Sequence, residues 1–266
     1  MNTDRPTPSP SPADQDTAVQ ISGVGLTYPG GIEALAGVDL AIPRGRLVTL
    51  LGPSGCGKTS LLKIIAGLIT PTAGEVSING TRIDGPGPDR AFVFQDFALL
   101  PWTTVLRNVA FGLELRGVEK AERHEIARHY IAEVGLTGFE DKYPHELSGG
   151  MRQRAGLARA LTVDSDVLMM DEPFSAIDEQ MRRKLQEDLL SLLQIEKKTV
   201  IFVTHSIEEA VYLSDEIALF SRHPGRVVDV VSTELDRAAG AEEIRRDRRY
   251  LDMVDRIWGD LKQYLS

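Results

Sequence analysis

The chain has 266 residues, of which 42% are hydrophobic, and its formal net charge is −9. This length allows one large core, or a core with a smaller satellite. The acidic balance argues against a nucleic-acid surface, because neutralising phosphates requires clustered Lys and Arg. The chain has a single cysteine, Cys56, so no internal disulfide can form, which is typical of a reducing compartment.

The first 17 residues are rich in Pro, Ser, Thr and Asp and have almost no apolar side chains. This composition predicts a disordered tail, and it lacks the basic segment and apolar stretch of a signal peptide. Elsewhere no apolar run approaches the roughly 20 residues needed to span a bilayer. We therefore expect a cytoplasmic chain that reaches a membrane only through a partner.

From residue 19 onward the pattern predicts regular structure. Apolar runs predict strands at 19–21, 35–42, 46–51, 75–78, 91–94, 167–170, 199–203 and 216–220. Helices are expected at 59–68, 180–194 and 207–213, with a charged helical stretch from 104 to 157. The first two strands are expected at an antiparallel edge. Strands that alternate with helices predict an α/β core.

The C-terminal segment 241–266 has helical periodicity. Its apolar residues recur at spacings of three and four: Leu251, Val254, Ile257, Trp258, Leu261 and Leu265. This pattern predicts an amphipathic helix that packs on its own domain, and partner binding or self-association is the alternative. Four arginines, Arg245, Arg246, Arg248 and Arg249, are expected to form a solvated face.

A glycine-rich run directly after the strand at 46–51 predicts a phosphate-binding loop. Glycines let backbone N–H groups converge on phosphate oxygens, and the following helix directs its N-terminus at the same anion. We expect Lys58 to contact the β- and γ-phosphates of ATP and Thr59 to bind Mg²⁺. For Cys56, a position that tolerates any small residue and a redox switch are both open. The predicted ATP-binding residues here are Gly52, Pro53, Ser54, Gly55, Cys56, Gly57, Lys58, Thr59 and Ser60.

A second candidate motif lies about 110 residues later, where the buried strand at 167–170 ends in Asp171 and Glu172. A capping pair of acids is the plain interpretation. After a phosphate loop, however, two acids at a strand end suit a metal site and a catalytic base. We expect Asp171 to hold Mg²⁺ and Glu172 to polarise the attacking water.

Residues 147–154, Leu-Ser-Gly-Gly-Met-Arg-Gln-Arg, resemble the signature motif of ATP-binding cassette (ABC) ATPases. The order of motifs also fits that family: phosphate loop, Gln95, signature, Asp171 with Glu172, and His205. The resemblance covers roughly residues 19–230. On residue type alone, Ser148 would be read as an ordinary helix cap, and His205 as an unremarkable residue after a strand.

The resemblance implies further roles. It places Tyr28 against adenine, Gln95 beside Mg²⁺ and the water, and His205 at the γ-phosphate. It sets Ser148, Gly149 and Gly150 against the ATP of an opposite subunit, and Asp178 in a loop across a homodimer interface. Ile177 and Ser175 are mild departures from the family pattern. Together these imply an ATPase that hydrolyses MgATP at sites shared between two copies.

The run 94–102, with 108–112 and 221–226, is similar to the nitrate, sulfonate and taurine importer ATPases. This implies two integral membrane permease subunits, an indirect solute-binding partner, and a peripheral position on the cytoplasmic membrane face. The apolar residues from Phe97 to Trp102 suit either core packing or a docking surface. The solute is left open. A non-import ABC ATPase, in lipid or lipoprotein release, repair or translation, is the alternative.

The expected fold is an α/β P-loop NTPase core with a mainly parallel sheet, an antiparallel β edge subdomain and an inserted α-helical subdomain. The expected domains are a tail at 1–17, a nucleotide-binding domain at 18–235 and an amphipathic helical extension at 236–266. The helical subdomain is placed at about 97–157 within the second of these.

Overall fold

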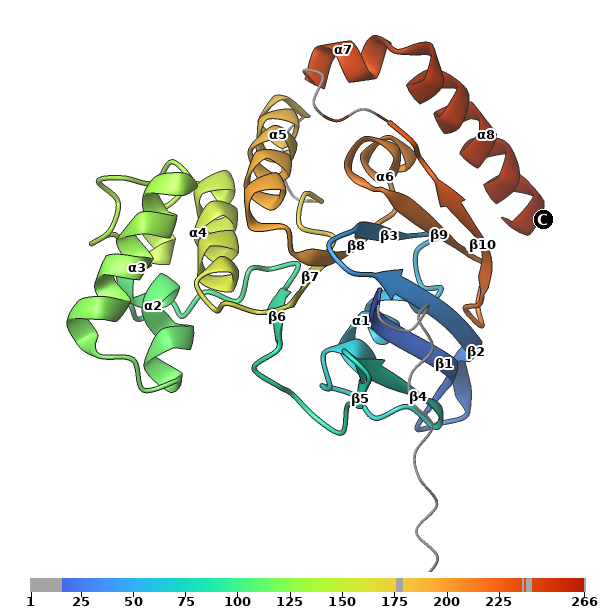
Figure 1. Cartoon of the computed structure of the whole chain (residues 1–266), viewed down its shortest axis with the longest axis horizontal. Helices are drawn as coiled ribbons and strands as arrows, with labels where there is room; N and C mark the ends of the chain where they lie inside the picture. Colours follow the sequence, from blue (N-terminus) through green and yellow to red (C-terminus); the bar gives the residue numbers. More distant parts are fainter. Residues whose placement is uncertain (1–15, 176–178, 236, 238–240, 266) are drawn as a thin grey trace, which may run out of the picture.

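The computed structural model describes residues 16–175, 179–235, 237 and 241–265. The predicted tail therefore lies almost wholly outside the described residues, and Thr17 already begins a strand. Figure 1 shows a two-sheet body, a lobe of helices on one side of it, and a C-terminal pair of helices that arches over the body.

A six-stranded sheet forms the centre of the body. Its strands, in spatial order, are β10 (Val227–Ser232), β9 (Glu216–Phe220), β3 (Leu47–Leu51), β8 (Thr199–Thr204), β7 (Val167–Asp171) and β6 (Arg90–Val93). All neighbouring pairs are parallel except β10 and β9, which are antiparallel. The mainly parallel sheet that the sequence predicts is confirmed.

The central strands are buried on both faces, which explains why they read as continuous apolar runs. Alternate residues enter two different cores. In β7, Val167 and Met169 face the core of the antiparallel sheet, while Leu168 and Met170 face the core beneath the C-terminal helices. The period of two thus builds a three-layer body, with both faces of the sheet covered.

A four-stranded antiparallel sheet covers one side of the body. Its strands, in spatial order, are β2 (Ile32–Pro43), β1 (Thr17–Tyr28), β4 (Ala73–Ile78) and β5 (Thr81–Arg82). Helix α1 (Lys58–Ile65) contributes four apolar residues to the core shared by the two sheets. The antiparallel edge is confirmed, and its two long strands extend beyond the predicted ranges.

The helical lobe follows β6 in the chain. It contains α2 (Val105–Leu115), α3 (Lys120–Glu133), the 3₁₀ turn η2 (Pro144–Glu146) and α4 (Gly149–Leu161). Helices α5 (Glu179–Glu196) and α6 (Ile207–Leu213) then pack on the large sheet. The described residues contain no candidate membrane-spanning helix.

The C-terminal segment forms two helices, α7 (Ala241–Arg246) and α8 (Arg248–Leu265), where one helical segment was expected. Its buried face is only part of the predicted one. Ile257 and Leu261 are buried, whereas Leu251 and Trp258 are about half exposed, at 51% and 54%. The side chain of Leu265 lies outside the described residues. Helix α8 packs on α6, so the contact face is selected by that neighbour.

Candidate active site

The phosphate loop connects β3 to α1 at the carboxyl edge of the large sheet. Gly57 immediately precedes α1 with φ 100°. A Cβ at Gly57 would meet the carbonyl oxygen of Ala34 at 2.7 Å, so only glycine fits there. The N–H groups of the first turn of α1 are thereby directed toward the loop, as anion binding requires.

The loop holds its own lysine. The Lys58 ammonium donates to the carbonyl oxygens of Gly52 at 2.7 Å and Pro53 at 2.8 Å, and it lies 3.6 Å from the Cys56 sulfur. Both Lys58 and Cys56 are buried. A buried ammonium surrounded by carbonyl oxygens suits exchange of those partners for phosphate oxygens. A redox role for Cys56 stays an open prediction.

Two predicted Mg²⁺ ligands lie together. The Thr59 hydroxyl donates to Asp171 Oδ1 at 2.8 Å. Burial raises the pKa of Asp171, while the hydrogen bond from Thr59 opposes that shift. A hydroxyl and a carboxylate beside a phosphate loop form the oxygen-rich donor set that Mg²⁺ prefers, so these residues fit the ion.

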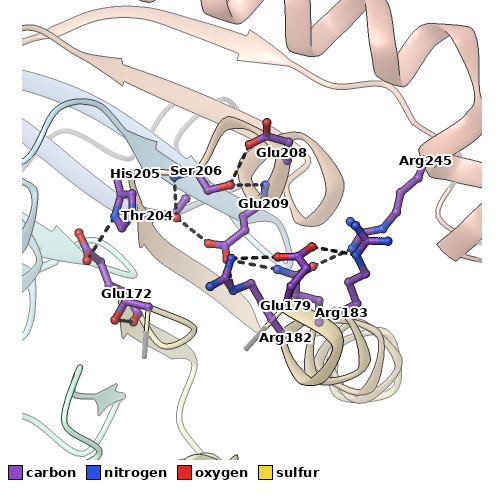
Figure 2. Close-up of polar contacts among 12 residues, drawn as sticks. Glu172, Glu179, Arg182, Arg183, Thr204, His205, Ser206, Glu208, Glu209 and Arg245 are labelled. Atoms are coloured by element: carbon purple, nitrogen blue, oxygen red, sulfur yellow. Dashed lines mark hydrogen bonds and ion pairs between the residues drawn. The ribbon is translucent and has the colours of Figure 1, made fainter. Parts of the chain in front are cut away.

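Glu172 and His205 face each other across two neighbouring strands. His205 Nδ1 lies 3.4 Å from Glu172 Oε2 (Figure 2). Glu172 has a positive φ of 44°, and its backbone N–H donates to the Val203 carbonyl at 3.0 Å. A non-glycine residue in this region of φ is uncommon and marks a position held by its surroundings. The turn thus directs the Glu172 side chain toward the end of β8.

A cavity of about 280 Å³ joins eight of the predicted residues. It is lined by Tyr28, Ser54, Gly55, Gly57, Lys58, Thr59, Ser60 and Glu172, together with Ile32, Ala34 and His223. The Tyr28 hydroxyl lies 3.0 Å from the Ser60 hydroxyl, which ties the predicted adenine-side aromatic to α1. The structure therefore brings an aromatic ring, a phosphate loop and a carboxylate into one space.

His223 is a lining residue that sequence reasoning missed. It lies in the run 221–226, whose resemblance to the importer ATPases was noted without assigning any residue to the site. Two hydrogen bonds hold this run on β2: Gly225 N–H donates to Ala34 O at 3.0 Å, and Ala36 N–H donates to Gly225 O at 3.1 Å. Pairing between segments so far apart in the chain brings His223 to the cavity.

Other predicted residues lie apart from this cavity. Gln95 donates from Nε2 to the Ser175 hydroxyl at 3.4 Å, beside the turn that carries Glu172. Ser148 caps α4 and accepts from the Met151 N–H at 3.3 Å. Figure 1 places α4 in the helical lobe, away from α1. Asp178 lies outside the described residues.

The residues from Phe97 to Trp102 divide between the two interpretations offered for them. Phe97 is buried in the core, where its Cβ lies against Gly156 of α4. Trp102 is 73% exposed. The first residue therefore packs the lobe against the body, and the last belongs to the outer surface.

A family model described as ABC transporter matches residues 35–175, which is just over half of the chain. The chain belongs to the ABC transporter family. As an ABC ATPase, it has the P-loop NTPase fold and the ATP-hydrolysing activity that the sequence predicts.

Relatives of this ABC ATPase extend the match over most of its length. It is 50% identical over 224 residues to an uncharacterized ABC transporter ATP-binding protein of Methanocaldococcus jannaschii, covering 84% of this chain and 81% of that one. It is 48% identical over 229 residues to the taurine import ATP-binding protein TauB of Pseudomonas syringae pv. tomato, covering 86% and 88%. The predicted taurine, nitrate and sulfonate type is thereby confirmed.

Solved structures agree with the fold of this ABC ATPase. The ATP-binding cassette MJ0796, in a dimeric post-hydrolysis state bound to ADP and Pi, matches with a TM-score of 0.73 and 33% identity. The match covers 80% of this chain and 98% of that one. The roles of the individual site residues stay predictions.

Proposed function

We propose that this ABC ATPase powers import of a small anionic or organic solute, such as taurine, a sulfonate or nitrate. Its relatives include taurine import ATP-binding proteins at 45–48% identity, which supports this choice. The observation that carries the catalytic part is the Glu172–His205 pair, which lies beside the phosphate loop and the Thr59–Asp171 pair. A carboxylate and an ammonium that line one cavity, with an imidazole 3.4 Å from the carboxylate, suit in-line attack of water on a phosphate.

In the proposed reaction, each residue acts through a contact already formed or nearly formed. Lys58 exchanges its carbonyl partners for phosphate oxygens and neutralises their charge. Glu172 orients the attacking water, and His205, 3.4 Å away, holds the carboxylate and the γ-phosphate in register. Tyr28 stacks on adenine. Mg²⁺ held by Thr59, Asp171 and Gln95 would supply further charge neutralisation at the phosphates.

The proposal assigns the second half of each site to another copy of the chain. Ser148, Gly149 and Gly150 lie at the start of α4, where a hydroxyl and free helix N–H groups can meet an anion. They line no part of the described cavity of their own chain. Head-to-tail closure of two copies, with Asp178 at their interface, would bring these residues to the γ-phosphate.

The proposed assembly places the ATPase pair on the cytoplasmic face of the plasma membrane. Two permease subunits span the membrane, and a solute-binding protein delivers the solute to them. The exposed Trp102, at the outer surface of the lobe, suits contact with a permease segment. No nucleic acid takes part, in keeping with the net charge of −9.

The decisive test of the catalytic proposal is Glu172→Gln. This variant should bind ATP as tightly as the parent and lose turnover, because the amide cannot orient and polarise water as the carboxylate does. The trapped ATP should also hold two copies together, which size-exclusion chromatography would detect. The exposed Glu75→Gln serves as a control that should retain turnover. Hydrolysis by Glu172→Gln at the parent rate would contradict the role proposed for Glu172.

The import proposal has its own test. Purification of the chain from detergent-solubilised membranes should recover a multi-span permease. A binding measurement on the cognate solute-binding protein, with taurine, alkanesulfonates and nitrate, then identifies the solute. Recovery of a ribosome or DNA partner would instead support a non-import ABC ATPase.

A further inference from the structure

Arg245, on α7 of the C-terminal extension, does not belong to a solvated face as the sequence predicts. Its guanidinium lies 4.4 Å from the centre of the Tyr212 ring, and Nη2 donates to Gln186 Oε1 at 2.8 Å. Tyr212 belongs to α6 and Gln186 to α5. One side chain of the extension therefore bridges the two helices that follow the ends of β7 and β8.

The contact with Arg245 holds the oxygen end of the buried Gln186 amide. Arginine has only donors, so it must face the amide oxygen. The amide nitrogen then faces Glu209 and donates to Oε1 at 3.3 Å. The Glu209 carboxylate accepts only, so it requires the amide nitrogen just as Arg245 requires the amide oxygen. The two partners hold Gln186 in one orientation, and without the arginine the amide oxygen loses this donor.

Glu209 connects this amide to the backbone around His205. Its other oxygen accepts from the Thr204 hydroxyl at 2.6 Å, and that hydroxyl accepts from the Ser206 N–H at 3.0 Å. The Thr204 hydroxyl, which Glu209 holds, therefore fixes both neighbours of His205 in the chain, Thr204 and Ser206. Burial raises the pKa of Glu209, while the hydrogen bonds from Thr204 and Gln186 oppose that shift.

Figure 2 shows this run of polar contacts with Glu172 and His205 at one end and Arg245, reaching down from the extension, at the other. Arg182 joins it midway, with Nε 3.8 Å from Glu209 Oε1. Every step from Arg245 to the Ser206 N–H is a hydrogen bond within 3.3 Å, and the backbone between Thr204 and Ser206 carries His205.

We infer that Arg245 is a positioning residue for ATP hydrolysis, which acts through Gln186, Glu209 and Thr204 to hold His205 against Glu172. The inference rests on the roles proposed above for Glu172 and His205. It makes the C-terminal extension part of the hydrolytic machinery, although Arg245 itself touches neither nucleotide nor water.

The test measures steady-state ATP hydrolysis by the purified full-length chain. Arg245→Ala should lower kcat roughly three- to tenfold, a range typical of residues coupled to a site at a distance. The KM for ATP should stay unchanged, because the phosphate loop and Tyr28 are not in the run. Arg245→Lys should restore part of kcat, since the ammonium can still donate to Gln186.

Arg246→Ala is the matched control, because Arg246 is an exposed neighbour on the same helix, where its guanidinium lies 3.2 Å from the exposed Glu242 carboxylate. It should leave kcat at the parent value. Gln186→Ala breaks the same run without altering the extension and should lower kcat in the same way. The double variant Arg245→Ala/Gln186→Ala should lose no more than the worse single variant, because both act through one route.

Three results would overturn the inference: a kcat of Arg245→Ala equal to that of Arg246→Ala, a change confined to KM, or losses that multiply in the double variant. If Arg245→Ala has a lower melting temperature than Arg246→Ala, the kcat values of Arg245→Lys and Gln186→Ala replace it as the test. Partial recovery in the first and a loss in the second support the inference, and the opposite results overturn it. Glu172→Gln and His205→Ala are measured alongside. Normal turnover in these two overturns the proposed function, whereas their inactivity with a normal Arg245→Ala overturns only this inference.

Discussion

Gly225 does not have the positive φ that usually explains a required glycine, yet the structure leaves no room for a side chain there. A Cβ added there would overlap the carbonyl oxygen of Cys56 in the phosphate loop. The loop therefore rests directly on the backbone of the run that carries His223. The requirement for glycine comes from the close approach of two chain segments, which the local sequence does not predict.

Gly225→Ala should both destabilise the fold and weaken ATP binding. Overpacking against backbone costs about 1–3 kcal/mol, because the loop or the run must move. Urea unfolding and a titration with ATP measure the two effects. Gly259→Ala is the control, since an added Cβ in α8 meets nothing within 4 Å and helix propensity should make it more stable by about 1 kcal/mol. Unchanged ATP affinity in Gly225→Ala would contradict the proposed support of the loop.

At this scale the sequence predicts the residues whose chemistry is local. The glycines, Lys58 and Thr59 form a continuous motif, and their geometry follows from the strand before it and the helix after it. His223 and Gly225 could not be found in this way. Their place depends on two hydrogen bonds to β2, a strand nearly 190 residues earlier in the chain.

Helix α8 shows where element-scale prediction stops. Tyr250, Ile257 and Leu261 are buried, while Leu251 and Trp258, seven residues apart, are about half exposed. Apolar residues on both sides satisfy the same spacings of three and four. Only contact with α6 decides between the two faces, and that contact is not a property of the helix sequence.

Alanine substitution should separate the two faces of α8. Ile257→Ala should cost about 2–5 kcal/mol, because it leaves a cavity against the core. Leu251→Ala should change the free energy of unfolding by no more than about 0.5 kcal/mol, as exposed positions do. Thermal unfolding of both variants measures the difference, and equal losses would contradict the assigned face.

Glu209, in α6, should make stability depend on pH. Its folded pKa is raised above the ordinary 4.5. Between these two pKa values the folded state binds more protons than the unfolded state. Stability should therefore fall as pH rises from 4.5 to the raised pKa and stay level above it. Urea unfolding of the parent and of Glu209→Gln over a pH series should show the free energy of unfolding of the parent falling relative to that of the variant across this window. A difference that does not vary with pH would show that Glu209 is not the group responsible.

The strand pattern was predictable at the element scale where both faces of a strand are buried. Strands β3, β7, β8 and β9 lie within a residue of their predicted bounds, because continuous apolar runs leave few alternatives. Strand β10 was missed. It lies at the sheet edge with a mostly exposed or half-buried pattern, so its sequence carries little periodic signal.

At the scale of the whole molecule, the two halves of the proposed site lie in different lobes. Lys58 opens α1 in the body, and Ser148 caps α4 in the helical lobe. The fold class was predictable because motif order carried it. The arrangement of the lobes was not, because it depends on contacts such as Phe97 with Gly156 rather than on any motif.

Separate half-sites predict that hydrolysis depends on protein concentration. Dilute chain should bind ATP at the phosphate loop but hydrolyse it slowly, and specific activity should rise as two copies associate. Hydrolysis assays over a dilution series, with ATP binding measured on the same samples, test this. Specific activity that stays constant through the range of dimer formation would contradict a shared site while leaving the loop intact.

The chain has only two tryptophans, and each one is a built-in optical reporter for a different event. Trp102, 73% exposed on the outer lobe, should change its emission when a membrane partner covers it. Trp258 lines a groove of about 310 Å³ with Gly52, Pro53 and His205, so its emission should respond when the phosphate loop rearranges. Replacing either one with Phe would leave a single fluorophore, and docking and nucleotide exchange could then be timed separately in the same protein without any attached dye.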